Sequence, residues 1–404
     1  MFKNLINNIK GDKYIWYIAA ILAVFSMLLV YSSARTLAYK SMHGSTEILL
    51  VKHLMNLGIG FGVIYLVHRV DHRYFSRIAQ LMLILSIFLL AYTLVFGIST
   101  NDATRWVKIP VIGLRFQSSD IARLALIMYT SRTISKMQGV IKDFKEVSIY
   151  LMGPIVLICA LIMLENLSTA AILFMTCIVI LFIGRVSTKY ILFIFGGGLL
   201  VGGMLFALSF FKIVDFGRAD TWVGRVDSWL HPDYSSDDLF QQKQANIAMA
   251  KGGFFRIAPG KSTQCNFLPE AYSDYIFSTL VEEYGLVGAI FILCLYLFFL
   301  YRIVVLYNKS TKAFGALMAV GLGISITMQA VMHMAVNTHL LPNTGITLPL
   351  ISWGGTSIVA NSIALGIILS VSAYVEKAPA TNSEVGLVKK RSPKKKDIVN
   401  DIHG

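Results

Sequence analysis

Charged residues are scarce in this 404-residue chain, where Asp, Glu, Lys and Arg together make up only 14% of the sequence. Soluble domains carry about 25% charged residues, and the 22 acidic side chains are too few to cover a water-soluble protein of this size. Apolar residues supply 56% of the chain, and the mean hydropathy is +0.66. The scarcity of charge excludes a soluble enzyme and predicts a protein that crosses a membrane several times.

Cysteine is also scarce, with four residues in the whole chain. Cys159, Cys177 and Cys294 lie within apolar runs, and Cys265 stands alone in a polar stretch. A disulfide framework needs paired cysteines, and a zinc site needs closely spaced ligands. The sequence indicates neither, and no other group of residues has metal-ligand spacing.

Long apolar runs, by contrast, are abundant. A helix needs about 20 mostly apolar residues to cross a bilayer. Ten such runs predict an all-α polytopic membrane protein with spans at residues 14–33, 50–67, 78–97, 119–135, 148–164, 166–183, 190–211, 275–300, 313–337 and 356–375. Residues 14–376 then form one membrane domain, in which a large loop at 212–274 joins the seventh and eighth spans.

Lys and Arg are concentrated in every second connecting segment, beginning with the N-terminal residues 1–13. Positively charged loops remain cytoplasmic, which predicts that both termini are cytoplasmic and that the loop 212–274 is on the outer face. The net charge of +14 comes largely from these loops and from the tail 377–404. We expect this basic tail to be disordered and to lie near anionic lipid or bind a cytoplasmic partner. The charge therefore does not indicate a nucleic-acid partner.

The uncommon polar residues gather at the predicted outer face, in segments 101–120, 165–169, 212–274 and 341–355. The predicted inner loops are short and basic, so any chemistry is expected outside. Spans four, six, eight and ten begin at that face, and helix N-termini attract anions. The capping residues expected at these starts are Ser118 or Ser119, Asn166 or Ser168, Ser273 or Asp274, and Thr356 or Ser357.

Two charges near the spans have more than one interpretation. Arg123 lies inside the fourth span, where it either forms an ion pair with Asp120 or binds an anion in an outward-open cavity. Asp274 lies where the long loop enters the eighth span, and it is either the helix N-cap or a functional carboxylate. Glu282 and Glu283 follow in the same span, and hydrogen bonding between helices is the simplest role for at least one of them.

Glycine and proline interrupt two apolar regions. In segment 341–357, two prolines and three glycines break the helix at membrane depth, which predicts a re-entrant wall of a cavity. In the seventh span, the glycines at 196–198 and 202–203 predict close helix packing. They lack the strand and turn context that a phosphate-binding loop needs.

With these segments identified, the chain resembles the SEDS family (shape, elongation, division and sporulation) over roughly residues 12–376. The resemblance is carried by residues 268–277 with Glu282-Glu283-Tyr284-Gly285, by residues 341–357, and by Arg105-Trp106 followed by residues 117–123. It implies a glycosyltransferase that polymerises lipid II into glycan strands at the outer face of the bacterial cytoplasmic membrane. Residues 345–349 and 354–357 and the basic tail are more similar to the division-type FtsW, which acts at the septum, than to the elongation-type RodA.

The resemblance also assigns residues to roles. Asp274 matches the acid of the family's Leu-Pro-Glu-x-x-x-Asp motif, which implies that it is catalytic, as a general base. The residues expected to bind the substrate and its diphosphate are Arg105, Trp106, Lys108, Gln117, Ser119, Asp120, Arg123, Glu270 and Ser352.

Two positions depart from the family pattern. The family's Gln-Pro-Ser-Glu-x-x-Lys reads here as Gln117, Ser118, Ser119, Asp120 and Arg123, which keeps the charges but changes their reach. The acid of the family's Pro-Asp-Leu-Gly-Thr becomes Asn166, with Glu165 beside it. Any role borrowed for that acid is therefore in question at this site.

Glycan polymerisation joins a sugar hydroxyl to an anomeric carbon and expels a lipid diphosphate. Asp274 would accept the hydroxyl proton. Cationic side chains, helix N-termini, or a divalent cation (Mg²⁺ or Mn²⁺) held jointly with the diphosphate would stabilise the leaving group.

The resemblance further implies partners, namely a class B penicillin-binding protein transpeptidase and the divisome regulatory membrane proteins. Three alternatives stay open, and the first is an elongation-type, RodA-like polymerase. A lipid II flippase would need polar groups along a route on both sides of the membrane, and a non-catalytic scaffold for a partner synthase would not need Asp274.

Overall fold

The computed structural model describes residues 10–33, 46–100, 103–108, 115–139, 143–211, 219–232, 239–256, 258–268 and 270–377. The predicted cytoplasmic N-terminus, except residues 10–13, and the basic tail from residue 378 onward lie outside the described residues.

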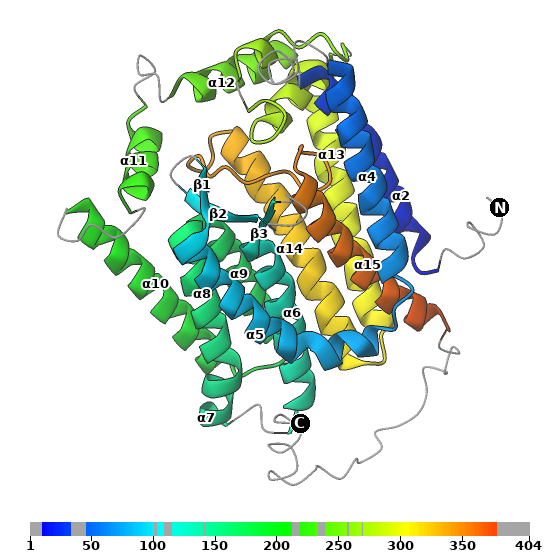
Figure 1. Ribbon diagram of the computed structural model, residues 1–404, viewed down its shortest axis with the longest axis vertical. Helices are drawn as coiled ribbons and strands as arrows, with labels where there is room; N and C mark the ends of the chain where they lie inside the picture. The colour runs from blue at the N-terminus through cyan, green and yellow to red at the C-terminus, as the bar shows by residue number, and fades with distance from the viewer. Residues whose placement is uncertain are drawn as a thin grey trace.

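Long helices packed side by side build the molecule (Figure 1). They are α2 (Lys13–Ser33), α4 (Thr46–Val67), α5 (His72–Phe96), α6 (Ser118–Lys136), α8 (Gly153–Glu165), α9 (Leu167–Ile183), α10 (Thr188–Phe210), α13 (Ile276–Lys309), α14 (Ala313–Asn337) and α15 (Gly355–Lys377). A short helix, α7 (Phe144–Val147), and a π-helical turn at Ser148–Met152 lead into α8.

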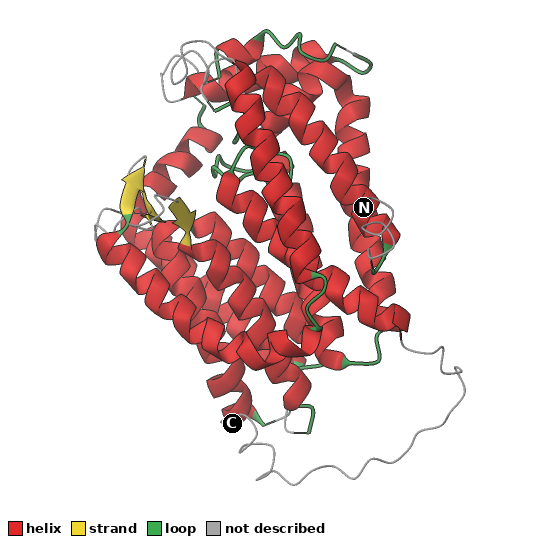
Figure 2. Ribbon diagram, turned by 45° about the vertical axis from the view of Figure 1, so that its right-hand side comes forward, coloured by secondary structure: helices red, strands yellow, loops and turns green. Residues whose placement is uncertain are grey.

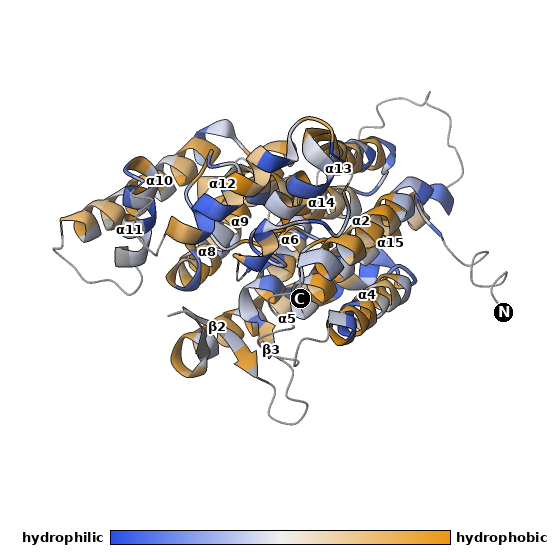
Figure 3. Cartoon of the chain, turned by 90° about the horizontal axis from the view of Figure 1, so that it is seen from above, coloured by the Kyte–Doolittle hydropathy of each residue, from blue (hydrophilic) through white to orange (hydrophobic). Residues whose placement is uncertain are grey.

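Every predicted span coincides with one of these helices, so the helical polytopic membrane fold is confirmed. Within the described residues, eight helical stretches are long and apolar enough to cross a membrane. Helix α9 is shorter, and α6 carries more polar residues than the others. The rim helices present large apolar side chains outward, such as Leu81, Phe88 and Val95, as a lipid-facing surface requires. The hydropathy colouring of Figure 3 shows hydrophobic residues along α4 and α10 at the edge of the bundle.

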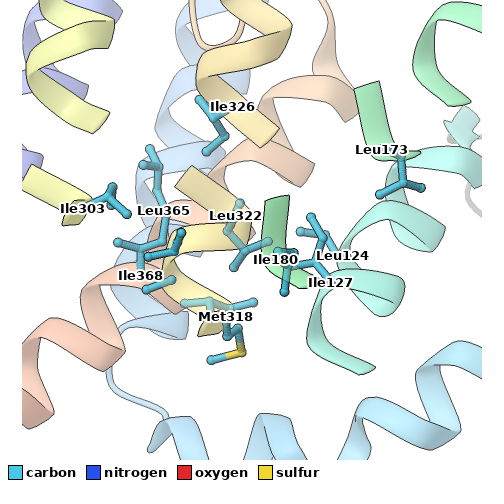
Figure 4. Close-up of a cluster of buried hydrophobic side chains, with 14 of the residues drawn as sticks. Leu124, Ile127, Leu173, Ile180, Ile303, Met318, Leu322, Ile326, Leu365 and Ile368 are labelled. Carbon is cyan, nitrogen blue, oxygen red and sulfur yellow. The ribbon is translucent and has the colours of Figure 1, made fainter. Parts of the chain in front are cut away.

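The interior is formed around α6, α14 and α15, whose side chains are mostly buried. Apolar side chains from five helices meet there, and they include Ile127, Ile180, Ile303, Leu322 and Leu365 (Figure 4). Gly321 on α14 permits this contact, because a Cβ atom there would lie 2.5 Å from Ile180.

Helix α10 does not pack as its glycines predicted. A Cβ atom at Gly196, Gly197, Gly202 or Gly203 would meet no atom within 4 Å, and Gly198 alone of this cluster faces a neighbour, Phe174. The prediction of close helix packing is therefore wrong for most of these glycines. Helix α10 lies at the edge of the bundle, so most of its side chains point away from other helices (Figure 1).

A small antiparallel sheet precedes α6 (Figure 2). Its strands are β1 (Ile98–Thr100), β2 (Ala103–Lys108) and β3 (Arg115–Gln117), in the order β1-β2-β3. Trp106 pairs with Gln117 in this sheet. The long loop 212–274 contains two further helices, α11 (Ala219–Leu230) and α12 (Phe240–Gly252), and a 3₁₀ turn at Gln264–Asn266.

The two ends of the bundle differ in what they join. At one end, Arg302 near the end of α13 donates hydrogen bonds to Asp12 just before α2, and the Asp12 backbone N–H donates to Ser372 on α15. This is called the Asp12 end. The opposite end, called the Asp274 end, holds the sheet, the start of α13 and the segment 338–354 between α14 and α15.

Candidate active site

Asp274 lies in a tight turn that precedes α13. The backbone N–H groups of Ser273, Asp274 and Tyr275 all donate to the carbonyl of Glu270. The N-cap of α13 is Tyr275, and no side chain caps it. The prediction that Ser273 or Asp274 caps α13 is therefore wrong, because both residues belong to the turn and the helix begins only at Ile276. The side chain of Asp274 is thus not engaged in capping α13.

The segment 338–354 holds this turn from the other side. The Ser352 hydroxyl donates to the Ser273 carbonyl at 2.8 Å and accepts from the Leu348 N–H at 2.8 Å. The Trp353 N–H donates to the Tyr272 carbonyl at 2.9 Å. Ser352 is buried, so the residue predicted to bind substrate acts here on the backbone beside Asp274.

Side-chain amides complete the support of Asp274. Asn337, the last residue of α14, donates to the Asp274 carbonyl at 2.9 Å. Asn343 donates to the Tyr275 hydroxyl at 2.8 Å. Gly345 lies directly against the carboxylate, since a Cβ atom there would be 3.2 Å from Asp274 Oδ2. The carboxylate is therefore placed by three separate parts of the fold.

The re-entrant wall predicted at 341–357 agrees with the depth of segment 338–354 in the bundle, although residues 355–357 already belong to α15. The segment is non-helical between the end of α14 and the start of α15. The Tyr296 hydroxyl of α13 donates to the Pro349 carbonyl, and the Ser26 hydroxyl of α2 donates to the Ile351 carbonyl. Both donors lie well within their helices, so the tip of the segment reaches the bundle interior, where protein surrounds it.

Arg123 is occupied by side chains of its own bundle. It lies 3.8 Å from Asp120, as the ion-pair interpretation predicted. It also donates to the amide oxygens of Gln329 on α14 and Asn361 on α15. Gln329 in turn donates to the Thr347 carbonyl at 3.0 Å. Arg123 thus links α6, α14, α15 and segment 338–354, and its side chain is only 5% exposed.

The other predicted binding residues fall into two groups. At the sheet, Gln117 donates to the buried Ser119 hydroxyl at 2.9 Å, and Trp106 is the strand partner of Gln117. Arg105 and Lys108 also belong to β2, but their side chains are outside what the structure describes. Glu270 belongs to the Asp274 turn, where it accepts a hydrogen bond from Ser273 at 2.8 Å.

The departure at Asn166 has a structural explanation. Asn166 is the N-cap of α9, and its side-chain oxygen accepts from the N–H groups of Ser168 and Thr169. This confirms one of the four capping predictions. Glu165 is buried at 1% exposure, with the Ser118 hydroxyl 3.5 Å away at the start of α6. The two neighbours therefore contact the starts of two different helices.

Glu282 and Glu283 support the loop that leads to Asp274. Glu282 accepts from the Thr263 N–H at 3.0 Å and from the hydroxyls of Ser262 and Thr263. Glu283 accepts from Ser32 on α2, which confirms an interhelical hydrogen bond for one of the pair.

Arg225 is a basic residue that the sequence analysis did not single out. It lies on α11, one turn before Trp229, whose ring N–H donates to the His339 carbonyl at 2.9 Å. Burial and the charge of Asp274 raise the pKa of Tyr275 to about 12, against the opposing effects of the Asn343 hydrogen bond and, to a smaller extent, of the Arg225 charge. Arg225 therefore lies within electrostatic reach of the residue next to Asp274. The one-turn spacing of Arg225 and Trp229 is the sequence signal that points to this face of α11.

Comparison with known proteins covers nearly the whole chain. The model of the FtsW/RodA/SpoVE family, described as cell cycle protein, matches residues 12–377. A probable peptidoglycan glycosyltransferase FtsW from Geobacter sp. (strain M18) is 32% identical over 371 residues, which cover 91% of this chain and 98% of that protein. The corresponding protein of Geobacter sulfurreducens (strain DL-1 / KN400) is 31% identical over 377 residues, covering 92% and 97%.

Solved structures share the fold. A chain from a study of how a peptidoglycan synthase complex coordinates polymerization and crosslinking superposes with a TM-score of 0.73, at 22% identity, covering 91% of this chain and 99% of that one. The rod shape determining protein RodA of Thermus thermophilus gives a TM-score of 0.63, at 22% identity, covering 90% and 96%.

Proposed function

The chain belongs to the FtsW/RodA/SpoVE family of cell cycle proteins, the SEDS family, and from this membership we propose that it is a peptidoglycan glycosyltransferase. Its substrate is lipid II, which it polymerises into glycan strands. The observation that carries the proposal is the Asp274 carboxylate, which the Asn337 amide, the Ser352 hydroxyl and Gly345 place at one end of a multi-pass membrane bundle.

Asp274 acts as the general base of this reaction. It accepts the proton of the acceptor sugar hydroxyl, whose oxygen then forms a bond to the anomeric carbon of the donor. The bond from that carbon to the diphosphate breaks, and the lipid diphosphate leaves with the electron pair. Tyr275 stays protonated at neutral pH, because burial and the Asp274 charge raise its pKa to about 12.

The departing diphosphate requires positive charge near Asp274. Arg225 is the cation that we assign to this role, because α11 carries it to the neighbourhood of Tyr275. Arg123 has a different part, since Asp120, Gln329 and Asn361 already engage it. It positions segment 338–354 and hence the Gly345 side of the site.

A protein-bound metal ion receives no support from the donor set. Across the described ranges, no three carboxylate, histidine or cysteine side chains converge. The Mg²⁺ or Mn²⁺ that the sequence analysis expects to be held jointly with the diphosphate stays a prediction.

The reaction takes place at the outer face of the bacterial cytoplasmic membrane. The start of α2 and the ends of α13 and α15 meet at the Asp12 end. With an even number of spans and both termini in the cytoplasm, these three helix ends are expected on the cytoplasmic side. Asp274 lies at the opposite end. With a division-type role, the protein works at the septum with divisome regulatory proteins and a class B penicillin-binding protein transpeptidase. The fold it shares with a chain of a peptidoglycan synthase complex supports such a partner.

The test is polymerisation of purified lipid II by the chain in vesicles, alone and with its transpeptidase partner. We expect glycan chains in the wild-type sample, and a transpeptidase inhibitor should leave their formation intact. A parallel assay should follow the movement of labelled lipid II across the same vesicles. Movement without polymerisation would contradict the proposal and favour the flippase function. The scaffold function would be favoured if the protein showed neither polymerisation nor lipid II movement but its partner still required the folded protein for its own activity.

A further inference from the structure

Helix α13 is interrupted at Gly285, and a part of the long loop fills the interruption. Gly285 has φ 67° and ψ −170°, which is not helical. Such a break leaves backbone groups without helical partners. The N–H of Leu286 donates to the Gly253 carbonyl at 3.0 Å, and the Glu283 carbonyl accepts from the Ala258 N–H at 2.9 Å. The loop segment 253–256 is therefore fixed to the backbone of α13, with Ala258 as a second point of attachment.

Gly285 is the residue that permits this contact. A Cβ atom there would lie 2.8 Å from the Phe254 carbonyl oxygen and 2.9 Å from the Arg256 nitrogen. Its φ also falls in the left-handed region, which a residue with a side chain rarely adopts. The sequence Glu282-Glu283-Tyr284-Gly285 thus encodes a docking point for the loop in addition to the bonds that the two acids make.

Two phenylalanines project from the docked segment. Phe254 and Phe255 are 58% and 77% exposed, and their rings meet edge to face at 4.8 Å between centroids. Just below the break, α13 presents its own exposed apolar side chains, Leu286, Val287, Ile290 and Phe291. Because the loop backbone is bonded to Leu286 and Val287, the two phenylalanines lie level with the first of these side chains. Exposed apolar side chains of the helix and of the loop therefore occur together at this level.

The depth of the break can be estimated along α13. From Gly285 to Lys309 the helix rises about 36 Å at 1.5 Å per residue. The hydrocarbon core of a bilayer is about 30 Å thick. The break therefore lies close to the outer boundary of the core, where the helix surface below it must face lipid. Lys251 and Arg256 lie beside the phenylalanines, and the Arg256 side chain donates to the Lys251 carbonyl. Aromatic and basic side chains together suit the interface between acyl chains and headgroups.

We propose that Phe254 and Phe255 insert into the outer leaflet and anchor the long loop to phospholipid at that level. The anchor concerns the whole loop, because Glu282 holds residues 262–264 just beyond it, and these lead to the Asp274 turn. It fixes the height of that turn above the bilayer, from which a lipid-linked substrate arrives. The catalytic consequence rests on the proposed function, but the insertion itself does not.

The insertion is tested by placing an environment-sensitive fluorophore at residue 255. In the full-length chain with Cys294→Ser, Phe255→Cys is labelled and reconstituted into phosphatidylcholine–phosphatidylglycerol vesicles. Cys159, Cys177 and Cys265 are buried, so they compete little for the label. We expect blue-shifted emission, strong quenching by nitroxides on the acyl chains and several-fold less quenching by iodide than at a control site. That control is Lys243→Cys, an exposed position on α12 of the same loop.

The outcomes separate the inference from the proposed function. Equal iodide quenching at residues 255 and 243, without quenching by the acyl-chain nitroxides, would overturn the insertion even if lipid II is polymerised. Lipid quenching at residue 255 in a chain without polymerase activity would support the insertion and count against the function alone. The double variant Phe254→Ser, Phe255→Ser should polymerise lipid II several-fold more slowly than the wild type in vesicles. An unchanged rate would show that the anchor does not affect catalysis.

Discussion

Asp274 and Gly345 lie against each other, so that a Cβ atom on Gly345 would be 3.2 Å from the carboxylate oxygen Oδ2. Gly345 also has a φ of +59°, in the left-handed region. Gly345 therefore has two roles at the site. It allows the backbone of segment 338–354 to turn, and its missing side chain leaves space beside the Asp274 carboxylate. A substrate hydroxyl needs that room to approach Asp274 within hydrogen-bond distance.

Gly345→Ala should lower polymerase activity by at least tenfold. The left-handed backbone makes the alanine variant less stable by about 1–2 kcal/mol, and the new methyl group crowds Asp274. The measurement combines the rate of lipid II polymerisation with thermal unfolding in detergent. Gly354→Ala is the matched control, since its Cβ would make ordinary contact with Ser357 at 3.5 Å. Full activity in Gly345→Ala would show that this space is not used by the substrate.

Ser352→Ala should lower kcat about tenfold and leave KM for lipid II nearly unchanged. The variant loses one hydrogen bond to the Ser273 carbonyl and one from the Leu348 N–H, so two buried backbone groups lose their partner. This costs about 2 kcal/mol and loosens the turn that carries Asp274. Ser310→Ala, at the Asp12 end, serves as control because its hydroxyl is exposed. A raised KM with normal kcat would instead indicate that Ser352 contacts the substrate.

Arg225→Gln should weaken binding of the diphosphate. We expect KM for lipid II and the inhibition constant of undecaprenyl diphosphate to rise together, by about tenfold, as expected for loss of a charge-assisted hydrogen bond. Arg225→Lys should recover part of the loss, because it keeps the charge without the planar fork. Lys243→Gln removes a charge elsewhere on the same loop and should change neither constant. Unaltered inhibition by the product in Arg225→Gln would exclude this role.

His339→Asn should make the protein less sensitive to acid. Burial lowers the pKa of His339, although its hydrogen bond with Gln242 opposes the shift. The unfolded chain therefore binds the proton first as pH falls through about 6.5, and stability of the folded state is lost from that pH down to the lowered pKa of the folded state. Asn suits the φ of +61° at this position. The fall in Tm between pH 8 and pH 5 should be smaller in His339→Asn than in the wild type. An equal fall in the two proteins would contradict this prediction.

The helices could be predicted from the sequence because each span is a long apolar run. Helix formation in such a run depends little on contacts with distant parts of the chain. It was insufficient for the sheet of β1, β2 and β3, whose strands are short and gain stability from pairing with one another. The glycines of α10 misled because a small residue permits close packing without requiring a neighbour. Small residues alone do not show which helices lie at the edge of a bundle.

The site was predicted unevenly for a similar reason. Asp274 could be proposed as a site residue from its motif, but its support by Asn337 and Ser352 joins parts of the chain that are 60 or more residues apart. Arg123 was identified as an intramembrane charge, whereas its partners Gln329 and Asn361 lie on helices far along the chain. Arg225 lies on a helix whose position depends on the contact between Trp229 and His339. No local pattern contains these contacts.

The central claim is that the Asp274 carboxylate is the base for glycan polymerisation. The most direct measurement compares the wild type with Asp274→Asn, which keeps the shape of the side chain and removes its charge. Both proteins are reconstituted at equal amounts with the transpeptidase partner, after equal thermal stability has been shown. We predict long glycan chains from the wild type and a rate lower by a factor on the order of 100 or more in Asp274→Asn. Equal rates of chain formation in the two proteins would contradict the account and move the catalytic base to another residue.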